Sequence, residues 1–142
     1  MENLETILYL SWEKKTCYKD SRDKWTLDKP YIGQCAVTSL IVNDLLGGDI
    51  MRVKVGDESH YYNVVDGKII DYTAKQYEDT GINYADGKLA YREVLLGNLD
   101  TRNRYYILVR NVKYNMELYR EEKNSKKETK IHELKLNEKI EY

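Results

Sequence analysis

Three residue types that cooperate in thiol chemistry occur in this chain in a fixed order. Cys35 follows Gly33-Gln34 at the start of an apolar segment, His60 lies in a β-prone run, and Asp71 lies in the next such run. A histidine beside a thiol can accept its proton, and a carboxylate beside a histidine fixes its tautomer and raises its basicity. Together the three residues predict a cysteine hydrolase or acyl-transferase site, which attacks an amide or ester carbonyl.

Cys35 lies where we expect a turn to become a buried helix. Residues 35–46 are apolar on nearly every side, as in a helix enclosed by its domain, and Gly47-Gly48 can cap its end. N–H groups at a helix start lack intrahelical partners and carry partial positive charge, so a thiol there ionises more readily than a free one. The backbone N–H of Cys35 and the side chain of Gln34 are the candidate oxyanion donors.

A hairpin is expected to bring the histidine and the aspartate together. Asp66-Gly67 separates two β-prone runs and is the strongest short hairpin signal. With these as the two loop residues, Tyr62 faces Asp71, and alternation along the strand places His60 on the same face. His60 and Asp71 are then diagonal neighbours about 7–8 Å apart between backbones, a gap that the side chains can close. A register shift of one residue would turn Asp71 away.

The other segments complete an α+β pattern. Helical spacing predicts helices over 2–15 and 89–96, and alternation predicts a strand over 50–55. A third helix can be capped by Asp100-Thr101 and is favoured there, although residues 105–109 are also strand-like. In the third helix one face is shared by Tyr105, Leu108, Val109 and Val112. Residues 16–30 are expected to be a loop, 121–128 a solvated linker, and 131–136 a terminal strand or hairpin with 139–142.

We therefore expect one domain over residues 1–142, long enough to bury a core without metal or disulfide. Its parts are an N-terminal helix in 1–19, the Cys/His/Asp core in 20–113 and a charged C-terminal extension in 114–142. The fold class is α+β, with the cysteine-bearing helix packed on a small antiparallel sheet. No cofactor is expected, and the pattern does not predict an oligomeric state.

Charge and hydropathy exclude several classes of partner. Lys and Arg number 23 against 24 Asp and Glu, a net charge of -1, which gives generic nucleic-acid binding little electrostatic support. The first residues lack the pattern of a signal peptide, and no apolar run reaches membrane-spanning length. We expect a cytoplasmic protein with neither a nucleic acid nor a membrane as its partner.

Each residue also has a plainer interpretation. A cysteine near a helix start is commonly a small hydrophobe, a strand histidine is commonly a half-buried polar residue, and Asp71 could cap the following turn. Cys17 and Cys35 could form a disulfide, which a reducing cytosol disfavours. Cys35, His60 and Asp71 with Cys17 or His132 could also bind zinc, but no Cys/His pair has the usual close ligand spacing, so no metal is expected. His132 is expected to be exposed.

The motifs around these residues occur together in a known family. They are Gly33-Gln34-Cys35, Gly47-Gly48, Ser59-His60-Tyr61-Tyr62-Asn63 and Asp71-Tyr72-Thr73, with Trp25, Pro30, Asn43-Asp44, Gln76-Tyr77 and Arg104-Tyr105. Through them the segment from about residue 20 to about residue 112 resembles the YunG-like family of small bacterial proteins. That family has no established activity, so the resemblance implies a common architecture and no particular reaction.

A broader resemblance concerns the order of the three residues. A cysteine on a helix followed by a histidine and an aspartate on adjacent strands is similar to the papain-like superfamily, which includes NlpC/P60 peptidases and transglutaminase-like proteins. The resemblance implies a papain-like core, with Cys35 as nucleophile, His60 as base and Asp71 as the residue that orients His60. It implies a peptide or small-molecule amide as substrate.

Four aromatic residues are candidates for substrate contact: Trp25, Tyr61, Tyr62 and Tyr72. Core packing is the commoner role of such side chains. The alternative function is a binding or regulatory module that keeps the fold, in which Cys35 and His60 contact a ligand without turnover. A zinc-stabilised structural domain is a third and weaker alternative.

Overall fold

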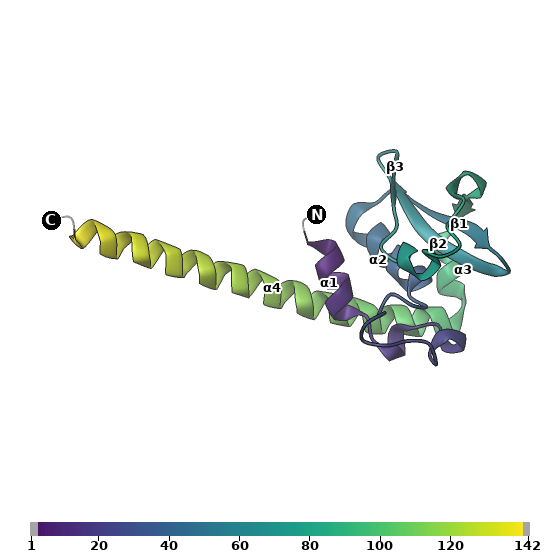
Figure 1. Ribbon diagram of the computed structural model, residues 1–142, viewed down its shortest axis with the longest axis horizontal. Coiled ribbons are helices and arrows are strands. Elements are labelled where there is room, and N and C mark those ends of the chain that lie inside the picture. Colours follow the sequence, from purple (N-terminus) through teal and green to yellow (C-terminus); the bar gives the residue numbers. More distant parts are fainter. Residues whose placement is uncertain (1–2, 141–142) are drawn as a thin grey trace.

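The structure is a computed structural model that describes residues 3–140, with side chains described as far as residue 136. The α-helices are α1 (Leu4–Ser11), α2 (Cys35–Leu46), α3 (Arg92–Gly97) and α4 (Leu99–Ile140). The strands are β1 (Asp49–Val55), β2 (Glu58–Val65), β3 (Lys68–Ile70) and β4 (Lys88–Ala90). Short 3-10 helices are η1 (Lys14–Thr16), η2 (Lys19–Ser21), η3 (Ala74–Tyr77) and η4 (Tyr84–Asp86). The sheet and most helices gather at one end of α4 (Figure 1).

The four strands form one antiparallel sheet in the order β3-β2-β1-β4. The turn between β2 and β3 has Asp66 at φ 50 and Gly67 at φ 75, the left-handed conformations of a two-residue hairpin loop. Its register is the predicted one, with the pairs Val65 and Lys68, Val64 and Ile69, and Asn63 and Ile70. Since β3 ends at Ile70, Asp71 lies one residue beyond the ladder.

Helix α2 has the predicted bounds and lies in the core. Its side chains from Val37 to Val42 are all buried, and Gly47 at φ 71 follows its last residue. The helix packs on β2, where the side-chain amide of Asn63 donates to the carbonyl of Ser39 at 3.0 Å. The α+β class and the packing of the cysteine-bearing helix on a small antiparallel sheet are therefore as expected.

The N-terminal helix is shorter than predicted because the chain turns extended at Trp12. The indole N–H of Trp12 donates to the Thr38 hydroxyl at 2.9 Å, which ties the end of α1 to α2. The side-chain amide of Asn111 on α4 donates to the Ser11 carbonyl at 2.9 Å and to the Glu13 carboxylate at 2.8 Å. Helix α1 lies beside α4 (Figure 1) and braces the core.

Helix α4 corrects the expectation for the C-terminal part. The predicted linker over 121–128 and strand over 131–136 are wrong, because one helix continues from Leu99 to Ile140. The proposed hairpin partner 139–142 extends to residues 141 and 142, which lie outside the described residues. Charged residues with good helix propensity and no Gly or Pro fill this stretch, and Lys126 pairs with Glu122 at 3.4 Å one turn away. The whole of 121–136 is exposed, His132 included.

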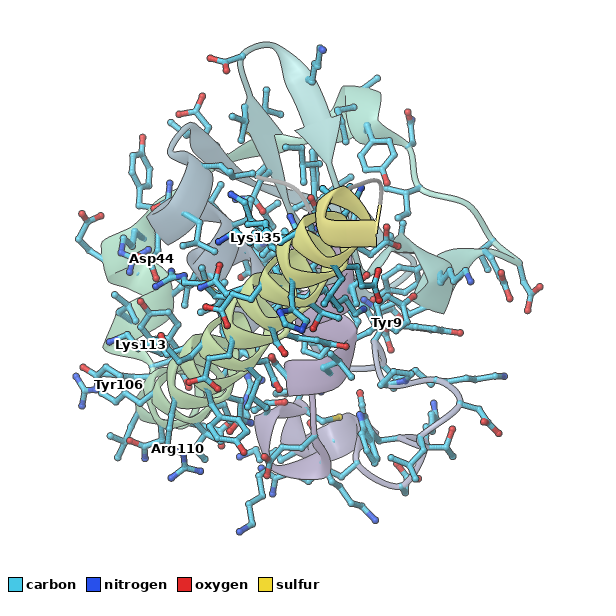
Figure 2. All side chains as sticks on the ribbon, turned by 90° about the vertical axis from the view of Figure 1, so that its left-hand side faces the viewer. Tyr9, Asp44, Tyr106, Arg110, Lys113 and Lys135 are labelled. Atoms are coloured by element: carbon cyan, nitrogen blue, oxygen red, sulfur yellow. The ribbon has the colours of Figure 1, made fainter. Side chains whose placement is uncertain are left out.

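The two sides of α4 differ near the domain. The predicted apolar face is confirmed, since Tyr105, Leu108 and Val112 are buried and Val109 is partly buried against the core. Figure 2 shows Tyr106, Arg110 and Lys113 on the outer side of the same helix, and all three are exposed. None of the helices described, over residues 3–140, is both long and apolar enough to cross a membrane.

A polar cluster joins the three helices α2, α3 and α4. The predicted helix over 89–96 is in fact strand β4 followed by α3, whose first residue is Arg92. Arg92 pairs with Asp44 at 2.6 Å and donates to the Leu40 carbonyl at 3.2 Å, and the Tyr105 hydroxyl donates to Asp44. This cluster fixes the C-terminal half of α2 against α3 and α4. Because α2 is one continuous helix, fixing this half also holds Cys35, the first residue of α2, in place.

Candidate functional site

His60 and Asp71 form the closest polar contact of the site. The Nε2 atom of His60 lies 2.7 Å from Oδ2 of Asp71, and the side chains are 0% and 4% exposed. The hairpin register places both residues on one face, and the position of Asp71 just after β3 lets its carboxylate turn toward the ring. The structure therefore brings this pair together as the sequence predicts.

The carboxylate of Asp71 is held by two further residues. The backbone N–H and hydroxyl of Thr73 donate to Oδ1 at 3.3 and 3.4 Å, and the Tyr84 hydroxyl donates to Oδ2 at 2.8 Å. Thr73 belongs to the motif Asp71-Tyr72-Thr73, whereas no sequence pattern indicates Tyr84. Tyr84 begins η4 in an irregular segment, and its approach to Asp71 depends on tertiary folding that no local pattern signals.

Aromatic rings enclose His60. The ring of Tyr62 stacks on it at 6.2 Å between centroids, and the ring of Tyr77 meets it edge-on at 5.1 Å. Tyr62 is buried, and a Cβ added to Gly87 would lie only 1.8 Å from its hydroxyl oxygen, so Gly87 makes room for this side chain. Tyr77 donates its hydroxyl to Glu58 at 2.8 Å. These contacts leave the imidazole little rotational freedom.

The charge of His60 is set by opposing effects. Burial by itself lowers the pKa of His60, but the interactions with Asp71 and Cys35 outweigh it and raise the pKa to about 9. The Nδ1 atom of His60 is buried and has no hydrogen-bond partner. A histidine with this pKa is protonated at neutral pH, and a protonated histidine stabilises a neighbouring thiolate.

Cys35 is the first residue of α2 and is half-buried. It shares a small interior gap with Tyr62 and Asp71. On its other side it lines an open cavity of about 500 Å³. The cavity is bordered by Gly33, Tyr61, Gln76 and Tyr77, with the charged residues Asp20, Lys24, Asp57, Glu58 and Arg104. Cys35 is therefore placed between the buried His60–Asp71 pair and a space open to solvent.

The other predicted site residues are placed differently. Gln34 is fully buried, and its Nε2 donates to the Glu13 carbonyl at 3.1 Å. Neither the cavity nor the interior gap at Cys35 is lined by Gln34 or Trp25. The indole of Trp25 donates to the Pro30 carbonyl at 3.0 Å, which stabilises the loop before α2. Tyr62 lies at the site, although behind the imidazole rather than along the open cavity.

The structure also bears on the disulfide and zinc alternatives. Both cysteines are free thiols, and Cys17 is fully buried with its pKa raised to about 11, mainly by burial. Among the described residues no group of three or more His, Cys, Asp or Glu side chains is placed to hold a metal ion. The ligand set suggested for zinc is thus not assembled in this part of the chain.

Unpartnered polar atoms gather around Cys35. Within the described residues, three buried side-chain atoms have no hydrogen-bond partner: Gln34 Oε1, His60 Nδ1 and Gln76 Nε2. Gln34 precedes Cys35 in the chain, His60 contacts it, and Gln76 lines the same cavity. Buried polar groups are usually satisfied in folded proteins, so the exceptions at His60 and Gln76 mark a place that is not optimised for stability alone.

Comparison with known proteins agrees with the motifs that surround this site. A family model described as YunG protein matches residues 1–117. The chain belongs to the YunG family. The matched residues include the whole Cys35, His60 and Asp71 arrangement, and they end within α4, before its fully exposed part.

The chain is also similar to a curated member of the YunG family. It is 37% identical over 78 residues to the uncharacterised protein YunG of Bacillus subtilis (strain 168), an alignment that covers 55% of this chain and 64% of that protein. The chain thus spans less than two thirds of the length of this relative. No solved structure matches the chain, so the papain-like resemblance has no structural relative behind it.

Proposed function

We propose that the protein is a cysteine-dependent hydrolase or acyl-transferase that acts on an amide or ester bond through a papain-like arrangement of Cys35, His60 and Asp71. The observation that carries the proposal is the buried His60–Asp71 pair, 2.7 Å apart, beside a half-buried cysteine at a helix start. A histidine with a purely structural role needs only a hydrogen-bond partner for its ring. This one is also enclosed by aromatic rings and interacts with Cys35, which borders a cavity.

In the proposed reaction each group has one task. Cys35 and His60 react as a thiolate–imidazolium pair, in which His60 already holds the thiol proton; the Cys35 sulfur forms a bond to the carbonyl carbon while the carbonyl electron pair moves onto oxygen. When this intermediate collapses, the bond to the amine or alcohol breaks and the leaving group takes the proton from His60. Water or a second amine then attacks the thioester and releases Cys35. Asp71 holds the imidazole in one tautomer throughout.

The substrate we propose is a peptide or small-molecule amide that enters through the 500 Å³ cavity. Three carboxylates border it against Lys24 and Arg104, and the guanidinium of Arg104 is already paired with Asp100 at 2.9 Å. A polyanion such as nucleic acid is disfavoured there. The mechanism also needs a reduced Cys35, which agrees with a cytoplasmic protein that uses neither a membrane partner nor a cofactor.

Two reagents test the proposal in the purified protein. Iodoacetamide alkylation, followed by peptide mapping, should modify Cys35 far faster than Cys17, and 4-nitrophenyl acetate should give a burst of nitrophenol with an acetylated Cys35. Cys35→Ser should abolish the burst. His60→Gln should slow both reactions by about 100-fold or more because it removes the group that takes the thiol proton and stabilises the thiolate. The matched control is His132→Gln, which changes the other, exposed histidine and should have no effect.

The unpartnered Nδ1 atom of His60 favours one rival, a binding or regulatory module without turnover. In that case Cys35 would alkylate no faster than Cys17, and no nitrophenol burst would appear. Either result would overturn the catalytic proposal. Fast alkylation without acetylation would restrict the site to a reactive thiol that forms no acyl intermediate.

A further inference from the structure

Gln76 lies at the site although no catalytic pattern in the sequence pointed to it. It belongs to η3, the turn that follows Asp71 and Thr73, and its backbone N–H donates to the Thr73 carbonyl at 3.2 Å. The turn that supports the carboxylate of Asp71 therefore also carries Gln76. Its side chain reaches the cavity that contains Cys35.

The two ends of the Gln76 amide are in different situations. Its Oε1 accepts the backbone N–H of Gly33 at 3.4 Å, two residues before Cys35. Its Nε2 is buried and has no hydrogen-bond partner. A primary amide whose oxygen is bound has its nitrogen oriented, because the group is planar. Gln76 therefore offers a fixed and unused N–H donor beside the cysteine loop.

Gly33 is itself firmly positioned. It has φ +71, and a Cβ added there would lie 2.5 Å from the Cys17 sulfur and 3.0 Å from the Tyr18 nitrogen. Its carbonyl also accepts the Tyr18 N–H at 2.8 Å. The backbone N–H of Gly33 that binds Gln76 thus belongs to a rigid turn. The side chain of Gln76 is therefore held in a fixed position relative to Cys35.

We propose that the side-chain amide of Gln76 is the oxyanion donor of this site, binding the substrate carbonyl oxygen as the Cys35 sulfur attacks. The inference rests on the proposed acyl-transfer function and adds a catalytic residue to it. A second donor comes from the start of α2, where no side chain caps the helix and the Cys35 N–H has no intrahelical acceptor. Two such donors stabilise the negative charge that forms on oxygen.

Gln76 replaces Gln34 in this role. The Nε2 of Gln34 is engaged by the Glu13 carbonyl, and Gln34 does not line the cavity. Its unpartnered atom is an oxygen, which cannot donate to an oxyanion. Gln76 has the opposite arrangement, with its oxygen bound and its nitrogen available. An oxyanion hole requires the arrangement of Gln76, because it needs an N–H donor that is not already bound.

A pair of reagents separates this role from a structural one. Attack on 4-nitrophenyl acetate forms an oxyanion, whereas alkylation by iodoacetamide displaces iodide at a saturated carbon and forms none. Gln76→Ala should therefore slow acetylation of Cys35 by about 100-fold and leave alkylation of Cys35 unchanged. Gln76→Glu keeps an acceptor for Gly33 but loses the donor, so its acetylation should also slow; because its negative charge disfavours the thiolate, the comparison with alkylation is made on Gln76→Ala. Lys75→Ala, an exposed neighbour outside the cavity, is the control and should alter neither rate.

The outcomes distinguish the two proposals. If the wild-type protein is not acetylated at Cys35, the proposed function fails and this inference fails with it. If the wild type is acetylated and both Gln76 variants are acetylated equally fast, only the role of Gln76 is wrong. Equal slowing of acetylation and alkylation in Gln76→Ala would also overturn it, because that result describes general damage to the site.

A second measurement uses the wild-type protein alone. Glutamine-selective ¹⁵N labelling gives two side-chain amide signals, because Gln34 and Gln76 are the only glutamines in the chain. Addition of acetaldehyde, which forms a hemithioacetal with a reactive thiol, places an oxygen where the oxyanion would lie. The Gln76 signal should shift strongly and the Gln34 signal should not. An adduct at Cys35 that leaves the Gln76 signal in place would contradict the assignment.

Discussion

The Nε2 atom of His60 lies 2.7 Å from Oδ2 of Asp71, one residue beyond the point where the β2–β3 ladder ends. Within the ladder the two strands are held at a fixed spacing. Just past it, the Asp71 backbone is free to follow Thr73 into a turn, and its carboxylate can face the imidazole directly. The contact therefore combines the register of a hairpin with the freedom of a strand end.

Asp71→Asn should lower the pKa of His60. The pKa is about 9 because the interactions with Asp71 and Cys35 outweigh burial, which by itself lowers it. Without the carboxylate we expect the pKa to fall by about 1–3. The Cε1–H NMR signal of His60 measures this, with His132 as the only other histidine signal. Asp79→Asn, an exposed change, is the control; an unaltered His60 titration in Asp71→Asn would refute this account.

The stability of the protein should fall as pH rises through about 9. The pKa of His60 is raised in the folded state from 6.5 to about 9, so its protonated form stabilises the fold. That contribution is complete below pH 6.5 and is lost between pH 6.5 and 9, by up to roughly 3 kcal/mol. Urea unfolding at a series of pH values measures it. The stability of His60→Gln should change less over the same pH range. A wild-type stability that increases with pH there would contradict this prediction.

Gly33→Ala should destabilise the fold more than Gly47→Ala. Both glycines have φ +71, but a Cβ at Gly33 would meet the Cys17 sulfur, whereas nothing lies within 4 Å of one at Gly47. Gly47 has φ 71 and ψ -147, a conformation nearly confined to glycine, so Gly47→Ala should cost about 1–3 kcal/mol from backbone strain alone. Gly33→Ala should add about 1–3 kcal/mol from the steric conflict. Chemical denaturation compares the two, and adding Cys17→Ala to Gly33→Ala should recover part of the difference.

Removal of the chain after Arg120 should leave the stability of the domain unchanged within about 0.5 kcal/mol. Residues 121–136 are exposed throughout and contribute no member of the core cluster. Helical circular dichroism should decrease while the urea midpoint stays the same. Truncation after Arg110 is the contrasting variant, since it removes buried Val112 and the Asn111 bonds to α1. A large loss of stability on the shorter deletion would show that the exposed part of α4 supports the core.

Much of the site could be predicted because its key spacing is local. The Asp66-Gly67 loop determines the register of the hairpin, and the register determines which face His60 and Asp71 share. The bounds of α2 followed from an apolar segment that ends in glycine. Tyr84 and Gln76 could not be found in this way. Each approaches the site from a short 3-10 helix, so its position depends on tertiary packing rather than on periodicity.

In the C-terminal part of the chain, the sequence pattern predicts irregular structure where the protein forms a helix. Its charge run was interpreted as a linker because charged residues without an apolar stripe have little to pack against. The same residues have high helix propensity, and α4 is already nucleated by its buried first turns, in which Tyr105 and Leu108 contact the core. Continuing an existing helix is far easier than starting one, so the exposed residues extend it. A sequence pattern applied to one short window at a time does not include the advantage of extending an existing helix.

The separation of the site residues along the chain has a consequence for the order of folding. His60 and Asp71 are 11 residues apart and joined by a tight turn, whereas Cys35 reaches them only after α2 docks on the sheet. Local hairpins close within microseconds, before distant segments assemble. The acid–base pair should thus exist before the nucleophile arrives, and the thiol would stay unactivated in every incompletely folded chain. Pulse alkylation during refolding checks this, since Cys35 should gain its reactivity only in the last phase.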